Sequence, residues 1–284
     1  MDLAQYKADT YSQFGEDGII AECLKRIEGQ VPLTRWCVEF GAWDGVHLSN
    51  TCRLIREESF SAVMIEGDAQ RFEELKLNLP EARVLGVLEW IALDGPKRLD
   101  SVLARTPIPE DFDVLSIDID GCDWHVWKSL KDFRPRLVCI EFNPTVTNDF
   151  AYVQPADFGV KRGCGPRALV ELAEEKGYVL AAATNVNLIF VLAEFADAVL
   201  GTDRPALDEL RDESKSATHV FVGYDGEIVM SAPLRLAWHR FEIRQEDIQV
   251  LPKSLRTYSD DYSNWQQIYY HVVRFWWKLR HWRF

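Results

Sequence analysis

The sequence predicts an α/β fold in which a doubly wound, mostly parallel sheet carries helices on both faces. Short apolar runs are well separated along the chain, and most of them end in glycine or a carboxylate. Segments with helical spacing of apolar residues lie between these runs. Strands that alternate with helices are typical of βαβ units. We expect one main domain with appendages, because 284 residues with 47% hydrophobic content can bury one sizeable core.

Four apolar runs have the composition of strands buried on both faces, which is the pattern of a parallel sheet. These runs are 36–40, 61–65, 113–117 and 137–140. Later apolar segments that we expect to supply the remaining strands are 178–183, 188–191 and 219–222. Helices are expected over 68–79, 98–104 and 166–177. The stretch 203–213 is acidic and is expected to be a solvated helix or loop.

The chain is expected to have three parts. Residues 1–30 form an N-terminal helical cover segment, and residues 31–230 form a Rossmann-like domain. Residues 231–284 form a helical C-terminal extension, which differs in composition because its last residues are basic and aromatic.

Composition restricts the cellular context. The formal net charge of -13 argues against nucleic acid as a partner, because an acidic surface repels phosphate. The six cysteines form no Cys-x-x-Cys pair, and Cys37 and Cys139 lie inside apolar runs where we expect small core residues. No basic flank followed by an apolar stretch opens the chain, and no run of about 20 apolar residues occurs. We therefore expect a cytoplasmic protein.

Polar side chains follow four of the expected strands at the point where each strand ends. Residues 39–45 (Glu-Phe-Gly-Ala-Trp-Asp-Gly) close the first strand, and Glu66 closes the second. Residues 118–123 and residues 141–143 follow the two later strands. In an open α/β sheet, ligands bind beyond the carboxyl ends of the strands. One such residue is commonly a helix cap, but four successive ends predict a nucleoside-type site.

The glycine pattern helps to choose the nucleoside. A dinucleotide site uses Gly-x-Gly-x-x-Gly so that a helix N-terminus faces the pyrophosphate. Here Gly41 and Gly45 have Trp43 between them, and Glu39 precedes the turn. A carboxylate suits a cationic ligand better than a diphosphate. S-adenosylmethionine carries a sulfonium and an ammonium group and has no phosphate, so it fits this pattern.

Several motifs resemble a known family. Residues 39–45 resemble motif I of the class I methyltransferases, with Trp43 in place of the usual central glycine. The segment 99–103 (Leu-Asp-Ser-Val-Leu), followed by 117–123 (Ile-Asp-Ile-Asp-Gly-Cys-Asp), resembles the FkbM-type methyltransferases, with aspartates in place of two glutamates. Residues 11–18 also look like a segment found ahead of the Rossmann core in related proteins. The resemblance covers roughly residues 11–195.

This resemblance implies roles for the matched positions. Glu39, Gly41 and Gly45 would frame the methionine end of the cofactor, and Glu66 would hold the ribose. Asp118 would lie near the amino group or the reacting methyl.

For the N-terminal segment there are two interpretations. Gln13, Glu16 and Asp17 either form a segment that closes over the cofactor, with Gln13 as a cofactor contact, or belong to an ordinary helix start capped by Ser12 or Asp17.

Methyl transfer to oxygen needs a base, and three residues are candidates. Asp120, Asp123 and His125 lie after the fourth expected strand. Asn143 is expected to be a substrate or catalytic residue. A further use of this edge is a Mg²⁺ ion held by Asp118, Glu141 and Asn143, as in catechol-type O-methyltransferases, although Glu141 and Asn143 would equally cap the following loop.

The last twenty residues, 265–284, interleave aromatic residues with Arg274, Lys278, Arg280 and Arg283 and contain no acidic residue. Such a helix suits a membrane interface, a protein partner or single-stranded nucleic acid. The alternative is that its aromatic residues pack back onto the core. Peripheral attachment at the inner face of the membrane follows from the first interpretation.

The sequence therefore predicts an S-adenosylmethionine-dependent methyltransferase that acts on a hydroxyl of a sugar, glycan or secondary metabolite. Loops 148–164 and the segment after Leu192 are expected to shape the acceptor pocket. One alternative is a nicotinamide-dependent oxidoreductase that uses the same sheet edge. Another is a non-catalytic module that binds a partner or membrane through its tail.

Overall fold

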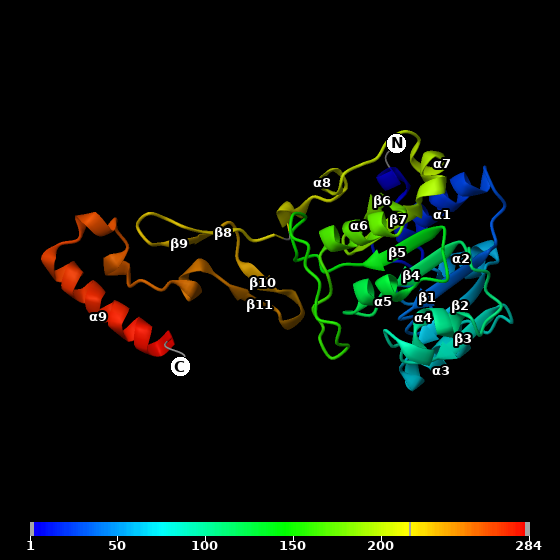
Figure 1. The fold of residues 1–284 in the computed structure, drawn as a ribbon, viewed down its shortest axis with the longest axis horizontal. Coiled ribbons are helices and arrows are strands. Elements are labelled where there is room, and N and C mark those ends of the chain that lie inside the picture. The colour runs from blue at the N-terminus through cyan, green and yellow to red at the C-terminus, as the bar shows by residue number, and fades with distance from the viewer. Residues whose placement is uncertain (1–2, 216, 282–284) are drawn as a thin grey trace. The chain divides into compact units, whose positions relative to one another are not determined.

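The computed structural model describes residues 3–215 and 217–281. The chain divides into two compact units, residues 1–216 and residues 217–284. The first unit holds the whole of the large sheet (Figure 1). The unit boundary lies fourteen residues before position 231, where the sequence placed the start of the C-terminal extension.

The large sheet has seven strands in the order β3-β2-β1-β4-β5-β7-β6. All neighbours from β3 to β5 pair in parallel, and β7 is antiparallel to both β5 and β6. The strands are β1 (Trp36–Phe40), β2 (Ser61–Glu66), β3 (Val84–Leu88), β4 (Val114–Ile117), β5 (Leu137–Glu141), β6 (Tyr178–Ala183) and β7 (Asn187–Leu192). The expected Rossmann-like sheet is confirmed, because strand order reverses direction between β1 and β4 as in doubly wound folds.

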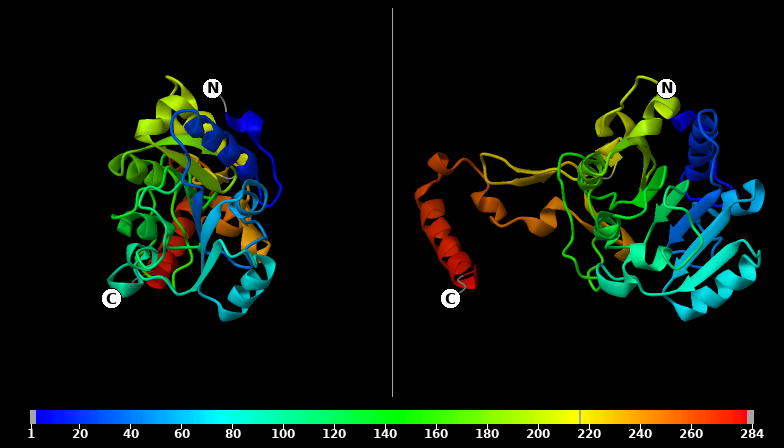
Figure 2. Two further views of the ribbon diagram at one scale, coloured as in Figure 1. Left: turned by 90° about the vertical axis from the view of Figure 1, so that its right-hand side faces the viewer. Right: turned by 45° about the vertical axis from the view of Figure 1, so that its right-hand side comes forward.

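Helices cover both faces of this sheet, as two further views show (Figure 2). α5 and α6 pack together on one face, whereas α1 and α7 pack together on the other. The helices of the first unit are α1 (Glu16–Glu28), α2 (Cys52–Glu58), α3 (Ala69–Asn78), α4 (Leu99–Leu103), α5 (Asp123–Ser129), α6 (Pro166–Glu175), α7 (Ala196–Leu200) and α8 (Leu207–Leu210). α8 is the only helix within the acidic stretch 203–213, and its Leu207 is buried.

The sheet core follows from the composition of its strands. Every residue of β4 and β7 is buried, as expected for strands covered on both faces. All six cysteines are free and buried, and Cys37 and Cys139 lie in the sheet core as expected. β3 is only partly buried and lies at the sheet edge. No strand was predicted there, because Gly86 interrupts the apolar residues of Val84–Leu88.

The second unit is built from small elements. It contains β8 (Val220–Val222), β9 (Ile228–Met230), β10 (Leu234–Leu236), β11 (Phe241–Ile243) and the helix α9 (Asn264–His281). β8 pairs only with β9, so the expectation that 219–222 supplies a strand of the large sheet is wrong. The physical reason is local: Gly223 and Gly226 allow a tight turn that folds β9 back onto β8. Among the described helices of the chain, none is long and apolar enough to cross a membrane.

Candidate functional site

A cleft of about 850 Å³ opens at the carboxyl edge of the parallel strands. Its lining comes from the segments that follow β1, β2, β3 and β4 and from one loop beyond β5. The lining residues are Phe40, Gly41, Trp43, Glu66, Gly67, Asp68, Gln70, Arg71, Glu89, Trp90, Ile91, Asp118, Ile119, Asp120, Phe158 and Lys161. The predicted convergence of strand ends is therefore present, and four of the predicted site residues line the cleft: Gly41, Glu66, Asp118 and Asp120.

The floor of the cleft lies at the point where strand order reverses, between β1 and β4. Gly41 has φ of +83°, and a Cβ atom there would come within 1.7 Å of the Asp118 carbonyl oxygen. The amide of Asp118 also donates to the carbonyl of Phe40 at 3.0 Å. The loops after β1 and β4 thus meet backbone to backbone, which only a glycine permits.

Glu66 ends β2 and is almost completely buried, with 8% of its surface exposed. One carboxylate oxygen accepts from the amide of Trp43 at 2.8 Å, and the other accepts from the amide of Asp68 at 2.7 Å. These bonds fix both oxygens in the cleft wall. Each oxygen has a further lone pair, so the carboxylate can still accept hydroxyl donors from a ligand.

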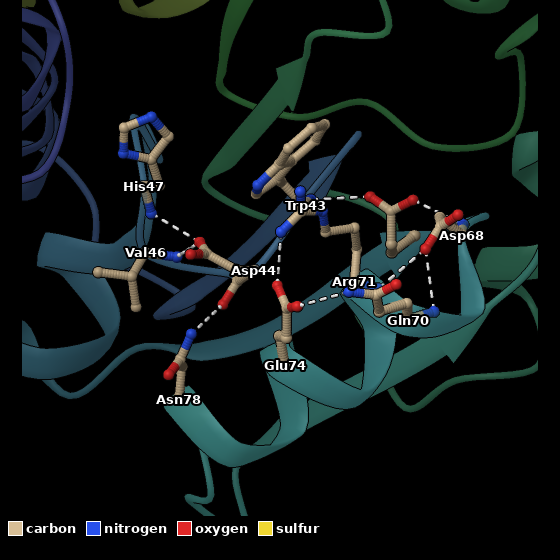
Figure 3. A network of polar contacts seen from close by, with 10 residues as sticks. Trp43, Asp44, Val46, His47, Asp68, Gln70, Arg71, Glu74 and Asn78 are labelled. Atoms are coloured by element: carbon tan, nitrogen blue, oxygen red, sulfur yellow. Dashed lines mark hydrogen bonds and ion pairs between the residues drawn. The ribbon is translucent and has the colours of Figure 1, made fainter.

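The neighbouring loop and helix α3 support this wall (Figure 3). Trp43 has φ of +49°, and the guanidinium of Arg71 lies 4.1 Å from the centre of its ring. Asp68 caps α3 by accepting from the amides of Gln70 and Arg71. Arg71 also forms an ion pair with Glu74 at 2.7 Å. Trp43 is therefore held in place although half of its surface is exposed.

The third wall comes from the end of β3. The ring of Trp90 lies against Gly67, where a Cβ atom would come within 2.4 Å of the ring. Glu89 beside it is paired with Lys97 at 2.6 Å. These residues were not among the predicted site residues, because no strand was predicted at β3. The apolar stretch Val84–Leu88 lies between the predicted helices 68–79 and 98–104, and it could have identified this strand from the sequence.

Three carboxylates gather at the ends of β4 and β5. Oxygen atoms of Asp118, Asp120 and Glu141 lie within 4.8 Å of one another. Burial raises the pKa of Asp118, and the negative charge of Asp120 raises it further. Burial and the charge of Asp118 raise the pKa of Glu141 more strongly, so Glu141 keeps its proton and donates it in a hydrogen bond to Asp118. We call these three residues the acidic cluster; it gains stability from any positive charge placed beside it.

Asp123 shapes the loop that carries the acidic cluster. Its buried carboxylate accepts from the amides of Ile119 and Gly121, both at 2.9 Å. Burial, followed by the charge of Asp118, raises the pKa of Asp123 to about 7. The resulting tight loop gives Asp120 a φ of +56° and leaves its side chain exposed at the cleft. Asp123, a predicted base candidate, is instead a loop-holding residue in this arrangement.

Glu39 does not line the cleft. It is 95% buried, and its carboxylate accepts from the hydroxyls of Ser49 and Thr51 at 2.5 and 2.6 Å and from the amide of Asn50 at 2.9 Å. Burial raises its pKa. The carboxylate expected to frame a cofactor thus anchors the loop that enters α2, which begins at Cys52.

Gly45 and Asp100 hold local structure outside the cleft. Gly45 closes a turn by donating to Ala42 at 2.7 Å, and it packs against Leu79 beyond α3. Asp100 of the Leu-Asp motif is buried and accepts from the amides of Lys131 and Asp132. Neither residue lines the cleft.

His125 and Asn143 are held by the loop 148–164 and its surroundings. The Nε2 atom of His125 lies 2.8 Å from the carbonyl oxygen of Gln154 and donates to it. The side-chain oxygen of Asn143 accepts from Thr145, and its amide donates to the carbonyl of Arg162 at 2.9 Å. The structure therefore brings Asp118 and Glu141 of the predicted metal set together with Asp120, while the side-chain oxygen of Asn143 is bound to Thr145.

The same loop supplies cleft residues that the sequence analysis named only as a range. Phe158 and Lys161 line the cleft, and the ammonium of Lys161 donates to the carbonyl of Ile119 at 2.9 Å. Gln154 ties the loop together by accepting from the amides of Arg162 and Gly163. The loop 148–164 thus contributes to the wall of the cleft, and its role in shaping an acceptor pocket stays a prediction.

The N-terminal segment is attached beside β6 and β7. Gln13 is exposed and does not line the cleft. The buried Glu16 accepts from Thr184 at 2.6 Å and from Asn187 at 3.1 Å. The residue that precedes the first turn of α1 is Gly15, and the carboxylate of Asp17 accepts from the three amides of residues 10–12.

Comparisons with known proteins give structural similarity only. No protein-family model matches the chain, and no curated protein matches its sequence. The O-methyltransferase from Bacillus cereus in complex with SAH superposes with a TM-score of 0.42 and 18% identity over 65% of this chain and 84% of that chain. A SAM-dependent methyltransferase from Aquifex aeolicus gives a TM-score of 0.39 and 9% identity over 67% and 97%.

The structure of LepI in complex with SAM gives a TM-score of 0.38 and 13% identity. The match covers 60% of this chain but only 46% of LepI, so the chain spans less than half the length of that protein. Identities of 9–18% describe a similar path of the chain and assign a role to no residue.

Proposed function

We propose that the protein is an S-adenosylmethionine-dependent methyltransferase whose cofactor occupies the cleft at the carboxyl edge of the sheet. The observation that carries the proposal is the distribution of charge along this cleft. A fixed carboxylate, Glu66, ends β2, and the acidic cluster follows β4 and β5. A ligand with a ribose and a positively charged end matches both features.

The turn after β1 argues against a dinucleotide. In pyrophosphate sites the glycine-rich turn leads directly into a helix whose N-terminus faces the phosphates. Here α2 begins at Cys52, seven residues after Gly45, and the intervening amide of Asn50 binds Glu39. The turn therefore lacks the anion-binding helix start that a nicotinamide dinucleotide would use.

The cofactor fits the cleft in one orientation. Glu66 accepts the ribose hydroxyls, with Trp43 and Trp90 offering aromatic surface for the adenine. Gly41 would lie beside the methionine end, and the acidic cluster would hold its positive groups. A positive charge at this position would stabilise the ionised form of Asp118, which burial alone disfavours.

The reaction is an in-line displacement. The acceptor oxygen attacks the methyl carbon, the bond from that carbon to sulfur breaks, and S-adenosylhomocysteine is released. The acceptor proton passes to a base, and Asp120 is the candidate with an exposed carboxylate in the cleft. Phe158 and Lys161 border the acceptor, for which we propose a hydroxyl of a sugar, glycan or secondary metabolite.

His125 and Asn143 have positioning roles in this proposal. Their side chains bind the carbonyls of Gln154 and Arg162, and both of these residues belong to the loop that carries Phe158 and Lys161. Replacement of either side chain is expected to alter the KM for the acceptor more than the turnover number.

The test is a pair of calorimetric titrations of the purified protein, one with S-adenosylhomocysteine and one with NADH. We expect micromolar binding of S-adenosylhomocysteine and no heat from NADH. Binding of NADH alone would replace the proposal with an oxidoreductase. A transfer assay with methyl-labelled cofactor and a panel of hydroxylated acceptors then separates an enzyme from a module that binds the cofactor without turnover.

A further inference from the structure

Helix α9 of the second unit has three distinct faces when its residues are placed at 3.6 per turn. One face is apolar and consists of Trp265, Ile268, Tyr269, Val272, Phe275, Trp276 and Leu279. A second face is polar and mostly basic and consists of Gln267, His271, Arg274, Lys278 and His281. The third face consists of Gln266, Tyr270, Val273, Trp277 and Arg280.

The third face contacts the rest of the second unit, and Gln267 of the polar face also donates to the carbonyl of Tyr262 at 3.3 Å. The side chain of Gln266 donates to the carbonyl of Ser254 at 2.9 Å, and the ring of Tyr270 lies 5.9 Å from that of Tyr262. No described residue of α9 is buried. Within the second unit, the aromatic residues of α9 therefore do not enter a buried core.

Every member of the apolar face is exposed, although Tyr269, Val272, Trp276 and Leu279 also border a hollow together with Gln249 and Val250. Ile268 exposes 68% of its surface and Trp276 exposes 65%, and the other five members are also exposed. Continuous apolar surface of this kind marks an interaction site, since scattered exposed apolar residues do not align along one helix face.

The charge of α9 selects the partner. Between Asn264 and His281 there is no acidic residue, although the whole chain has a net charge of -13. Residues 217–284 contain nine Lys and Arg against seven Asp and Glu, so the negative charge lies in the first 216 residues. A basic face next to an apolar face rich in Trp and Tyr matches the composition of the interface of an anionic bilayer.

We propose that α9 lies in the surface of an anionic lipid bilayer, with its apolar face among the acyl chains and Arg274 and Lys278 at the level of the headgroups. The cytoplasmic leaflet is the anionic surface that such a helix meets in a cell. The helix does not cross the bilayer, in agreement with its composition. This inference concerns the second unit and does not depend on the cofactor.

The experiment is flotation of the full chain with vesicles of phosphatidylglycerol and phosphatidylcholine, compared with vesicles of phosphatidylcholine alone. We expect the protein to float with the anionic vesicles only. The double variant Ile268→Asp, Trp276→Asp is expected to lower the partition coefficient at least tenfold, because each change keeps an apolar side chain out of the membrane. Arg274→Glu, Lys278→Glu is expected to lower it at least about 25-fold, because each basic residue contributes about fivefold and the new carboxylates are repelled by the anionic lipid.

Matched controls change the first unit in the same way. Leu77→Asp alters an apolar side chain that is 80% exposed on α3, and Lys25→Glu, Arg105→Glu reverses two exposed charges. Both controls should float like the wild type. Far-UV circular dichroism verifies that every variant is folded.

Three results would overturn the proposal. These are no flotation of the wild type, equal flotation with neutral vesicles, and unchanged flotation of the Ile268→Asp, Trp276→Asp variant. If the wild type fails to float but forms a dimer that this variant dissociates, the apolar face is instead an interface between copies of the chain.

Discussion

Replacing Glu66 with glutamine is the most direct test of the cofactor site. In the proposed complex, the Glu66 carboxylate accepts two ribose hydroxyls while it continues to accept from the amides of Trp43 and Asp68. A hydrogen bond to a charged acceptor contributes about 1.5–3 kcal/mol. Glutamine has one neutral acceptor oxygen, so it loses one of these bonds and weakens the other. We expect a loss of about 2–4 kcal/mol, which corresponds to a Kd for S-adenosylhomocysteine that is roughly 30- to 1,000-fold higher.

The same substitution also affects folding, and the structure gives the size of this effect. The two backbone donors bind different oxygens of Glu66, so glutamine leaves one of them facing its amide nitrogen. An unsatisfied buried donor costs about 1–3 kcal/mol. This is smaller than the stability of a typical domain, which is about 5–15 kcal/mol. The variant should therefore fold and can be titrated at 25 °C, after urea denaturation has measured its stability.

Asp44 provides the matched control. One oxygen of its carboxylate accepts from the amides of both Val46 and His47, at 2.9 and 2.7 Å, and Asp44 does not line the cleft (Figure 3). Asp44→Asn keeps this oxygen and should bind S-adenosylhomocysteine as the wild type does. If Glu66→Gln also binds like the wild type while its stability falls as calculated, Glu66 only holds the loops together and the reasoning is refuted.

Three further predictions concern the edge of the sheet. Gly95→Ala should lower the free energy of unfolding by about 1–2 kcal/mol, because φ is +68° with open space around the new Cβ. Gly41→Ala should lower it by at least about 2 kcal/mol more, because its Cβ would overlap the Asp118 backbone. Equal urea midpoints of the two variants would contradict this. Burial raises the pKa of Asp118 to about 6 and that of Glu141 to about 10, so the folded state holds protons that the unfolded chain has released. The stability of the ligand-free protein should therefore fall as the pH rises from about 4 toward 10, and less steeply in Glu141→Gln; parallel pH profiles of the two proteins would argue against the coupled pair. Asp120→Asn should lower the turnover number at saturating cofactor about 10²-fold or more; a turnover number equal to that of the wild type would exclude Asp120 as the base.

The strand ends illustrate how far local pattern predicts a site. Glu66, Asp118 and Asp120 were identified because carboxylates directly follow apolar runs, and the parallel pairing of β1, β2 and β4 brings such positions to one edge. The pairing itself follows from runs that are buried on both faces. The sequence alone therefore predicts that residues at the ends of these strands lie close together.

The use of each carboxylate was not predictable in the same way. Glu39 lies two residues before Gly41 and has the position and the charge expected of a cofactor ligand. Its carboxylate is instead bound by the hydroxyls of Ser49 and Thr51. Trp90 was missed because β3 is a partly exposed edge strand with a weak apolar pattern. In both cases the outcome depends on contacts between segments that are distant in sequence or weakly patterned.

The amino-acid sequence by itself determined the class of the fold, the edge of the sheet at which polar groups gather and the amphipathic character of the last helix, because these depend on periodicity and on the residues directly beside each strand. Only the tertiary structure decided which carboxylates face the cleft, which ones accept hydrogen bonds from neighbouring loops, and which face of α9 is exposed. The physical reason is that a buried carboxylate accepts hydrogen bonds from whichever donors lie beside it, and these donors are brought there only by folding.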